Sequence, residues 1–269
     1  MSLDNKLAQL KKALLKMDSV LVAYSGGSDS AFLLKVAKDI LGDKVIAVTA
    51  DSATYPKDEL KFAKQMANRL GVKHIIIKTG ELKNNNFLSN PRNRCYFCKK
   101  ELFSKLKNIA REKNINFVID ATNSSDKKDF RPGSIAKKQL GVRSPLEEAG
   151  ISKEDVRRLS KNLGLPTWNK PPLACLASRI PYGTKITNKI LRRINEAEGF
   201  IKGLGFSQVR LRHYNGLARI EVLKKDIPRL IKMGRLITDR LRELGYNYAT
   251  VDLEGYRTGS LNITPGLKG

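Results

Sequence analysis

The glycine-rich segment 25–30 of this 269-residue chain combines small residues with hydroxyl groups and one carboxylate. An apolar run over 20–24 precedes it and predicts a buried strand, and the apolar residues that follow recur at helical spacing up to Leu41. The first N–H groups of a helix lack internal partners and carry partial positive charge, and glycines let a ligand approach the backbone closely. The segment therefore predicts a phosphate cradle. Its residues are Ser25, Gly26, Gly27, Ser28, Asp29 and Ser30.

Three cysteines form a second reactive group. Cys95 and Cys98 are spaced C-x-x-C at the start of a predicted helix, and Cys175 lies in a proline-rich loop. An odd number of cysteines in a reducing compartment argues against a disulfide framework. Zinc usually takes four protein ligands, so a zinc site here would need a histidine beside the three cysteines. His74 falls in a predicted strand and His213 in a separate small domain, so neither is a convincing fourth ligand. A [4Fe–4S] cluster with one open iron and three unlinked cysteines are equally good interpretations of the spacing alone.

Alternating strands and helices position these residues. The first part of the chain is predicted to be α/β, with a doubly wound parallel sheet, because buried strands and amphipathic helices follow one another. Ligands of such folds bind at the carboxyl ends of the strands, where both the glycine-rich segment and Asp51 would lie. The predicted strands cover 20–24, 45–50, 72–78 and 117–121, and the predicted helices include 3–16, 57–70, 100–113 and 152–163.

A cluster of prolines and glycines up to Gly183 predicts a domain boundary. Residues 1–182 would form the nucleotide-binding domain with the three cysteines, and residues 183–269 a smaller α/β domain for substrate binding or oligomerisation. The smaller domain is predicted to contain helices over 187–203 and 226–245 and a short strand over 248–252. Its two other strands, 209–214 and 218–223, flank Asn215–Gly216, a strong hairpin signal.

The net charge of +25 suggests anionic partners in general. The basic residues are spread over both parts of the chain, with no basic tract, so we do not expect a nucleic acid partner. The N-terminal residues lack an apolar signal-peptide core, and no apolar run approaches the length of a membrane helix. We therefore expect a cytoplasmic protein without a membrane partner. We also expect it to form a homo-oligomer.

Segment 25–30 has the pattern S-G-G-x-D-S, which resembles the signature of the pyrophosphatase-loop (PP-loop) ATPases. Further stretches extend the likeness over most of the chain, so that it resembles the LarE family. That family inserts sulfur during synthesis of the nickel-pincer nucleotide cofactor. The stretches are Tyr24–Ser30, Tyr55–Leu60, Arg94–Lys100, Ala121–Asn123 with Asp129–Gly133, Leu146–Gly150, Pro171–Gly183, Arg210–Tyr214 and Ala218–Val222.

The resemblance implies a reaction. With ATP and Mg²⁺, such an enzyme adenylates a carboxylate of a pyridinium biscarboxylate mononucleotide and releases pyrophosphate. Sulfur then displaces AMP and leaves a thiocarboxylate. Some family members have one cysteine, at the position of Cys175, and sacrifice its sulfur. Others have three and carry the sulfur on a [4Fe–4S] cluster, which a separate donor reloads. The three-cysteine pattern places this chain with the second type, with Cys95, Cys98 and Cys175 as cluster ligands.

The same resemblance assigns residues to roles. Arg210 and Arg212 would hold the substrate phosphate; they are two apart on a strand and so share one side. An exposed strand face is their structural alternative. Arg179 would steady the carboxylate or adenylate, with Cys175 and Asp29 as the other catalytic residues. Asp51 would line the adenosine pocket. Further substrate-site candidates are Arg131, Glu198 and Glu221. For Glu198 a solvated helix face is an equal alternative.

One position departs from the pattern. Where related PP-loop enzymes often have two successive acids, this chain has Ser125 before Asp126, which leaves the role of the first acid unassigned.

Two other functions remain as alternatives. A PP-loop tRNA-thiolation enzyme would share the adenylation step and a three-cysteine cluster, but the chain lacks paired zinc-binding C-x-x-C motifs and a basic RNA-binding appendage. A non-catalytic nucleotide-binding or RNA-binding protein would not need an intact loop over 25–30. A glutamine-dependent amidotransferase is less favoured, because no cysteine lies at the N-terminus to release ammonia.

Overall fold

A computed structural model describes residues 1–128, 132–171, 174–257 and 259–262. It divides the chain into two compact units. The first comprises Met1–Phe87 and Arg92–Leu173, and the second comprises Leu88–Pro91 and Ala174–Gly269. The loop of Cys175 thus groups with the second unit, while the boundary near 182 stays a prediction. No helix in the described part of the chain has both the length and the apolar character needed to cross a membrane.

The first unit has a parallel four-stranded sheet in the order β3-β2-β1-β4. β1 lies at its centre, with Val20 opposite Val45 on one side and Phe117 on the other. The strands are β1 Val20–Ala23, β2 Val45–Asp51, β3 Lys73–Lys78 and β4 Phe117–Ile119. The main helices are α1 Leu3–Met17, α2 Ser28–Leu41, α3 Lys57–Arg69, α5 Arg94–Glu112 and α8 Lys153–Asn162, and the shorter ones are α4 Asn85–Leu88, α6 Gly133–Gln139 and α7 Pro145–Glu148.

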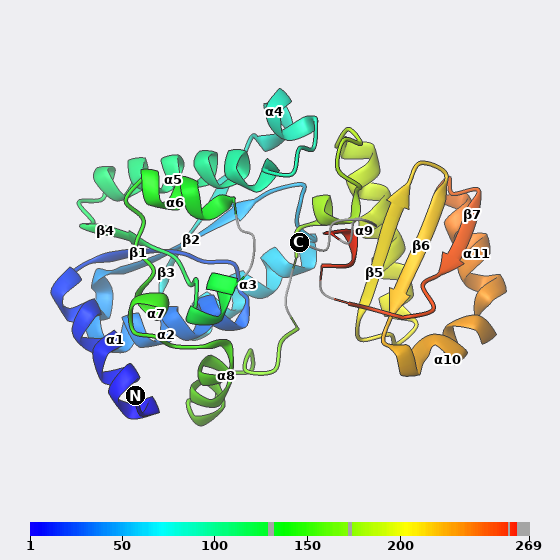
Figure 1. Ribbon diagram of the computed structural model, residues 1–269. Coiled ribbons are helices and arrows are strands. Elements are labelled where there is room, and N and C mark those ends of the chain that lie inside the picture. The colour runs from blue at the N-terminus through cyan, green and yellow to red at the C-terminus, as the bar shows by residue number, and fades with distance from the viewer. Residues whose placement is uncertain (129–131, 172–173, 258, 263–269) are drawn as a thin grey trace. The chain divides into compact units, whose positions relative to one another are not determined.

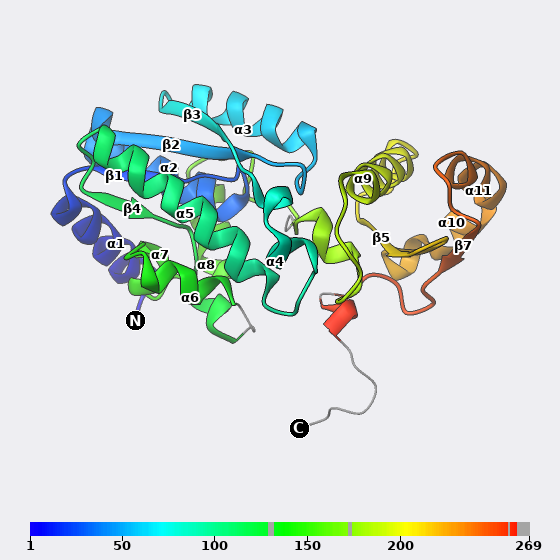
Figure 2. The same ribbon diagram turned by 90° about the horizontal axis from the view of Figure 1, so that it is seen from above.

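Helices cover both faces of this sheet, as Figures 1 and 2 show. Alternate residues of β1 enter two separate cores: Val20 and Val22 pack with residues of α1, α2, α3 and α8, whereas Leu21 packs with α5. A strand that buries both faces has a continuous apolar run, which explains the pattern over 20–24. The doubly wound parallel α/β fold predicted for the first part of the chain is confirmed.

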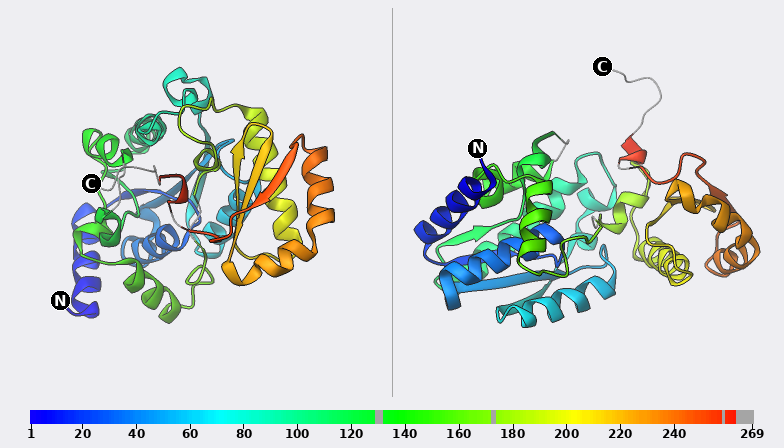
Figure 3. Two further views of the ribbon diagram at one scale, coloured as in Figure 1. Left: turned by 45° about the vertical axis from the view of Figure 1, so that its right-hand side comes forward. Right: turned by 90° about the horizontal axis from the view of Figure 1, so that it is seen from below.

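The second unit is a smaller α/β unit with a three-stranded sheet in the order β5-β6-β7. β5 and β6 form the hairpin predicted at Asn215, whose φ of 51° lies in the left-handed region, and β7 pairs parallel to β6. Helix α9 lies against β5 and beside α11 (Figure 3). The strands are β5 Val209–Tyr214, β6 Leu217–Val222 and β7 Tyr248–Val251, and the helices are α9 Asn188–Gly203, α10 Ile227–Lys232 and α11 Gly234–Glu243.

The single helix predicted over 226–245 is wrong. Two helices occupy this range, because Met233, with φ −93° and ψ 11°, ends α10 and directly precedes α11. Gly234, which has a low helix propensity, opens the second helix. Apolar periodicity continued through the break and therefore concealed it. The helix predicted over 152–163 forms as α8, and Ser152 caps it with a complete capping box.

Candidate active site

The glycine-rich segment forms a tight loop between β1 and α2. The Ser30 hydroxyl donates to the Gly27 carbonyl over 3.2 Å, lies 3.1 Å from Ser25 Oγ and accepts from the Ser25 N–H over 3.3 Å. Gly27, directly before α2, has no side chain that could cap the first turn. The N–H groups and the positive end of the helix dipole are therefore left for an anion, as the sequence predicts.

The two glycines of the loop have different roles. Gly26 has φ +72°, and a Cβ atom there would lie 2.9 Å from the Cβ of Ala63 in α3. Gly27 has no such backbone constraint, and its added Cβ would meet Ser25 Oγ at 3.3 Å. Gly26 is therefore needed for the fold of the loop itself, because it supplies both the left-handed turn and the close approach to α3.

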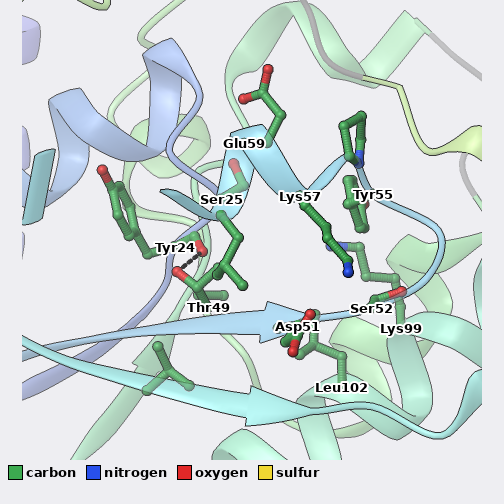
Figure 4. A pocket seen from close by; sticks show the side chains of 15 residues that line it. Tyr24, Ser25, Thr49, Asp51, Ser52, Tyr55, Lys57, Glu59, Lys99 and Leu102 are labelled. Atoms are coloured by element: carbon green, nitrogen blue, oxygen red, sulfur yellow. Dashed lines mark hydrogen bonds between the residues drawn. The ribbon is translucent and has the colours of Figure 1, made fainter. Parts of the chain in front are cut away.

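A pocket lies beside the loop, at the carboxyl ends of β1 and β2 and the start of α3. Its lining combines apolar side chains such as Val48 and Leu60 with polar groups of Ser25 and Asp51. Figure 4 shows Ser25 and Asp51 around this pocket, together with Lys57 from α3. The position matches the strand-end crevice expected for a nucleotide, with the phosphate loop at one side.

Behind the pocket, a polar network joins the end of β1 to β2 and to the start of β3. Thr49 Oγ1 donates to the carbonyl of Tyr24 over 2.7 Å, as the dashed line in Figure 4 marks. The same oxygen lies 2.7 Å from His74 Nε2, which must then supply the hydrogen. Burial, with the nearby charge of Lys64, lowers the pKa of His74. A neutral imidazole thus steadies the backbone that leads into the loop.

Glu81, a carboxylate that is 2% exposed, is a further residue at this pocket wall. It accepts hydrogen bonds from Ser52 Oγ and, over 3.3 Å, from Thr54 Oγ1. Both hydroxyls lie in the segment that leads from Asp51 to Tyr55, and all three of Asp51, Ser52 and Tyr55 line the pocket. Glu81 therefore orders one wall of the pocket, and no local pattern around position 81 predicted this.

Two lysines from distant segments reach the loop. Lys153 Nζ lies 2.6 Å from Asp29 Oδ2 and 2.7 Å from Ser28 Oγ. Lys170 Nζ donates to the Gly26 carbonyl over 3.1 Å and to Glu59 Oε2 over 2.7 Å. Lys153 follows Asp29 by 124 residues and Lys170 follows Gly26 by 144, so a motif search around the loop could not find them.

The carboxylate of Asp29 also fits Mg²⁺. Its Oδ1 is buried and has no hydrogen-bond partner among the described residues. Carboxylate oxygens are ordinary Mg²⁺ ligands, and the ion usually binds one or two of them together with substrate phosphates. A nucleotide at this loop would supply those phosphates.

The cysteines lie in two different units. Cys95 and Cys98 occupy the first turn of α5 in the first unit, and Cys175 directly precedes a short helical turn, Leu176–Arg179, in the second. Cys95 is exposed, and Cys98 and Cys175 are half-buried. Neither unit by itself contains, within its described residues, a group of three metal-binding side chains.

Arg179 is a buried residue that holds the Cys175 loop. Its guanidinium forms a two-pronged ion pair with Glu198, with Nε–Oε1 at 2.9 Å and Nη2–Oε2 at 3.0 Å. Its Nη1 donates to the carbonyls of Ala174 and Cys175 over 2.7 and 3.0 Å. Glu198 Oε1 also accepts the N–H of Leu211 in β5. The solvated helix face is thus not the environment of Glu198, which is 2% exposed.

A second buried ion pair joins Arg212 and Glu221, with contacts of 2.9 and 2.8 Å. Arg212 also donates to the Ser178 carbonyl and to Ser260 Oγ. Burial by itself would raise the pKa of Glu221, but the hydrogen bonds and charge of Arg212, with Ser260 and Arg219, outweigh it and lower the pKa. Most of the Arg212 guanidinium is therefore already bound within the protein.

Arg210 lies two residues earlier on β5 and is also buried, so the exposed strand face considered for this pair is wrong. Its guanidinium carbon lies 5.3 Å from the centre of the Tyr256 ring. Burial, with the neighbouring charge of Arg179, lowers its pKa. In the second unit, fold and hydrogen bonds thus gather Cys175, Arg179, Glu198, Arg212 and Glu221 into one network. Arg131 lies outside the described residues.

Similarity to known proteins agrees with this site. Residues 19–153 match the family model of the arginosuccinate synthase N-terminal HUP domain. The chain is also 37% identical over 264 residues to the pyridinium-3,5-bisthiocarboxylic acid mononucleotide synthase of Lactiplantibacillus plantarum, covering 98% of this chain and 96% of the relative. The chain belongs to the LarE family. This membership makes it an enzyme and argues against the non-catalytic alternative.

Other relatives extend the comparison. An uncharacterised protein of Synechocystis is 44% identical to this LarE-family chain, covering 97% of this chain and 98% of the relative. A glutamine-hydrolysing GMP synthase chain of Thermoplasma volcanium is 26% identical over 176 residues, covering 60% of this chain and 56% of the relative. The relatives from Synechocystis and Lactiplantibacillus plantarum thus align with both units, whereas the GMP synthase chain aligns with only part of this chain.

The two loop glycines give a first prediction. Gly26→Ala should lower the free energy of unfolding by about 1–3 kcal/mol and abolish ATP binding, because alanine is strained at this φ and its Cβ would clash with Ala63. Gly27→Ala is the matched control in the same loop and should unfold nearly as the wild type does. Urea unfolding and ATP titration would measure both. Equal destabilisation by the two variants would contradict the assignment.

The buried ion pair of Arg179 gives a second prediction. Arg179→Gln leaves the Glu198 carboxylate unpaired and should cost about 3–5 kcal/mol of unfolding free energy. It should also release the carbonyls of Ala174 and Cys175, so that Cys175 is alkylated faster; peptide mapping by mass spectrometry would show this. Arg240→Gln breaks an exposed pair with Glu243 in the same unit and should cost less than about 1 kcal/mol. Unchanged Cys175 reactivity in Arg179→Gln would refute the loop-holding role.

Proposed function

We propose that this chain is an ATP-dependent sulfurtransferase that converts a carboxylate of a pyridinium biscarboxylate mononucleotide into a thiocarboxylate. The observation that carries the proposal is the pocket that adjoins an uncapped helix N-terminus, in a chain similar over nearly its full length to a synthase of this product class. We expect the enzyme to act in the cytoplasm, as a homo-oligomer, on a small molecule.

In the first step, a carboxylate oxygen of the substrate attacks the α-phosphorus of ATP. The bond from that phosphorus to the bridging oxygen breaks, and the electron pair leaves with pyrophosphate. A carboxylate is a poor electrophile, and the mixed anhydride with AMP gives it a good leaving group. The loop Ser25–Ser30 would bind the phosphates through backbone N–H groups, Asp51 would contact the adenosine, and Asp29 would hold Mg²⁺, which offsets phosphate charge.

In the second step, sulfur forms a bond to the activated carbon and AMP departs with the original carboxylate oxygen. Arg210 and Arg212 are proposed to hold the substrate phosphate, with Arg131 and Glu221 as further substrate-site candidates. Because Glu221 already pairs with Arg212, the phosphate would have to share that guanidinium. Arg179 and Glu198 would act by positioning the Cys175 loop, since both are occupied by each other and by backbone groups.

For the sulfur source, we propose a [4Fe–4S] cluster held by Cys95, Cys98 and Cys175. The support is the count and type of side chains, since three cysteines supply the thiolate donors that such clusters require. When bound, the cluster supplies a labile sulfide on the iron that lacks a cysteine ligand. A sulfur donor must then reload it after each turnover.

The reaction is tested by its product. Anaerobically reconstituted enzyme, supplied with ATP, Mg²⁺, sulfide and the mononucleotide, should form AMP, pyrophosphate and a product whose mass reflects exchange of oxygen for sulfur. Cys175→Ala should retain substrate-dependent exchange of pyrophosphate into ATP but form no thiocarboxylate. If wild-type enzyme thiolates tRNA and leaves the mononucleotide unchanged, the proposed substrate is wrong.

The cluster is tested separately by analysis. Iron and labile sulfide should each be about four per chain after reconstitution, and should be lost when Cys95, Cys98 or Cys175 is changed to Ala. Iron absent from the wild type, or retained without Cys175, would refute the cluster. Mass spectrometry of Cys175 after turnover would then show whether its own sulfur is consumed.

A further inference from the structure

A short segment just before the C-x-x-C helix belongs to the same unit as Cys175. The chain enters the second unit at Leu88, leaves it after Pro91 and enters it again at Ala174. Helix α5, which carries Cys95 in its first turn, begins three residues after Pro91. A short length of chain therefore joins the C-x-x-C helix to the unit that contains the third cysteine.

Asn90 is the residue that fixes this segment within the second unit. Its side chain is fully buried, and its own carbonyl accepts the N–H of Gly183 over 3.0 Å. The side-chain Nδ2 lies within hydrogen-bond distance of three carbonyl oxygens, those of Ile180 at 3.3 Å, Pro181 at 2.7 Å and Thr184 at 3.1 Å. An amide nitrogen has two N–H donors, so the three oxygens enclose it and satisfy both.

These partners continue the loop of Cys175. Arg179 donates to the Cys175 carbonyl over 3.0 Å, and the partners of the Asn90 amide begin at the next residue. Farther along, the N–H of Ile186 donates to the Leu88 carbonyl over 2.8 Å. The loop is thus held on one side by the buried arginine and on the other by the segment that leads to the C-x-x-C helix.

The backbone of Asn90 allows its amide to be tested separately. Its φ of 54° lies in the left-handed region, which asparagine tolerates better than most residues and glycine tolerates best. Replacement by glycine therefore removes the amide while the backbone conformation stays accessible. Asn114, near the end of α5, has nearly the same φ of 52° but is exposed. It offers a matched position at which the same substitution removes no buried amide.

We propose that Asn90 is a positioning residue that keeps the Cys175 loop on a short tether to Cys95. Cys95 follows Asn90 by five positions, which cannot span more than about 18 Å even when fully extended. Without the bonds of Asn90, the chain between the two cysteines would be the whole stretch from position 95 to position 175. A short tether raises the effective concentration of one thiol at the other. The inference rests on the proposed function only in that these thiols serve one cluster.

The test measures this effective concentration in the metal-free full chain. With Cys98→Ser, the sequence retains Cys95 and Cys175 as its two thiols. After one arm of a bifunctional maleimide has reacted, the other arm is captured either by the second protein thiol or by added glutathione, and peptide mapping gives the ratio of the two products. Asn90→Gly should lower the share of cross-linked product by about tenfold, and Asn114→Gly should leave it unchanged.

A second variant decides the question if Asn90→Gly does not fold, which thermal unfolding would show. Four glycines inserted between Arg92 and Asn93, which are both exposed, lengthen the tether and leave the bonds of Asn90 in place. Effective concentration falls with tether length, so this insertion should lower the cross-linked share by about two- to threefold.

Other results would overturn the proposal. A wild type whose two thiols are never cross-linked would exclude the tether. Lower thermal stability of Asn90→Gly with an unchanged cross-linked share would leave Asn90 a purely structural residue, and a share that ignores the insertion would have the same meaning. None of these measurements uses ATP, substrate or metal. Failure of the wild type to form thiocarboxylate would therefore refute the proposed function and leave the cross-linking result intact.

Discussion

The turn from β1 into α2 is the constraint on which the first unit depends. At Gly26 the chain must take a left-handed conformation while it passes within contact of Ala63 in α3. This close approach brings α3 against the loop, so that residues at the start of α3 complete the pocket. It also leaves the first turn of α2 without a side-chain cap. The same backbone geometry therefore packs the helix and creates the site for an anion.

Charge around this turn is balanced by residues that are remote in the chain. Lys153 neutralises Asp29, Lys170 pairs with Glu59, and Glu81 satisfies two hydroxyls of the adjoining wall. Shielded charges are costly unless they are paired. These distant partners therefore offset the charges around the loop, and Lys170, which also donates to the Gly26 carbonyl, helps to hold the loop in place.

Buried ion pairs also organise the second unit, where they lie around the Cys175 loop. Arg179 with Glu198 and Arg212 with Glu221 are buried pairs whose remaining donors bind backbone carbonyls near Cys175. Arg179 and Arg212, which the sequence suggests as substrate-binding groups, thus hold the backbone around Cys175 in place. This arrangement restricts the motion of the Cys175 loop by tying it to α9 and β5, and it makes each arginine important for stability.

The sequence by itself determined the strand–loop–helix unit, the doubly wound fold, the hairpin at Asn215 and the family resemblance, because each depends on signals within a short stretch or on a direct likeness. Only the tertiary structure decided that Lys153 faces the phosphate loop, that Glu81 orders the pocket wall, and that Arg179 supports Cys175. The break at Met233 also needed the structure, since the apolar pattern runs through it. The physical reason is separation: Lys153 and Asp29 are 124 residues apart, and only packing of α8 beside α2 brings their charges together.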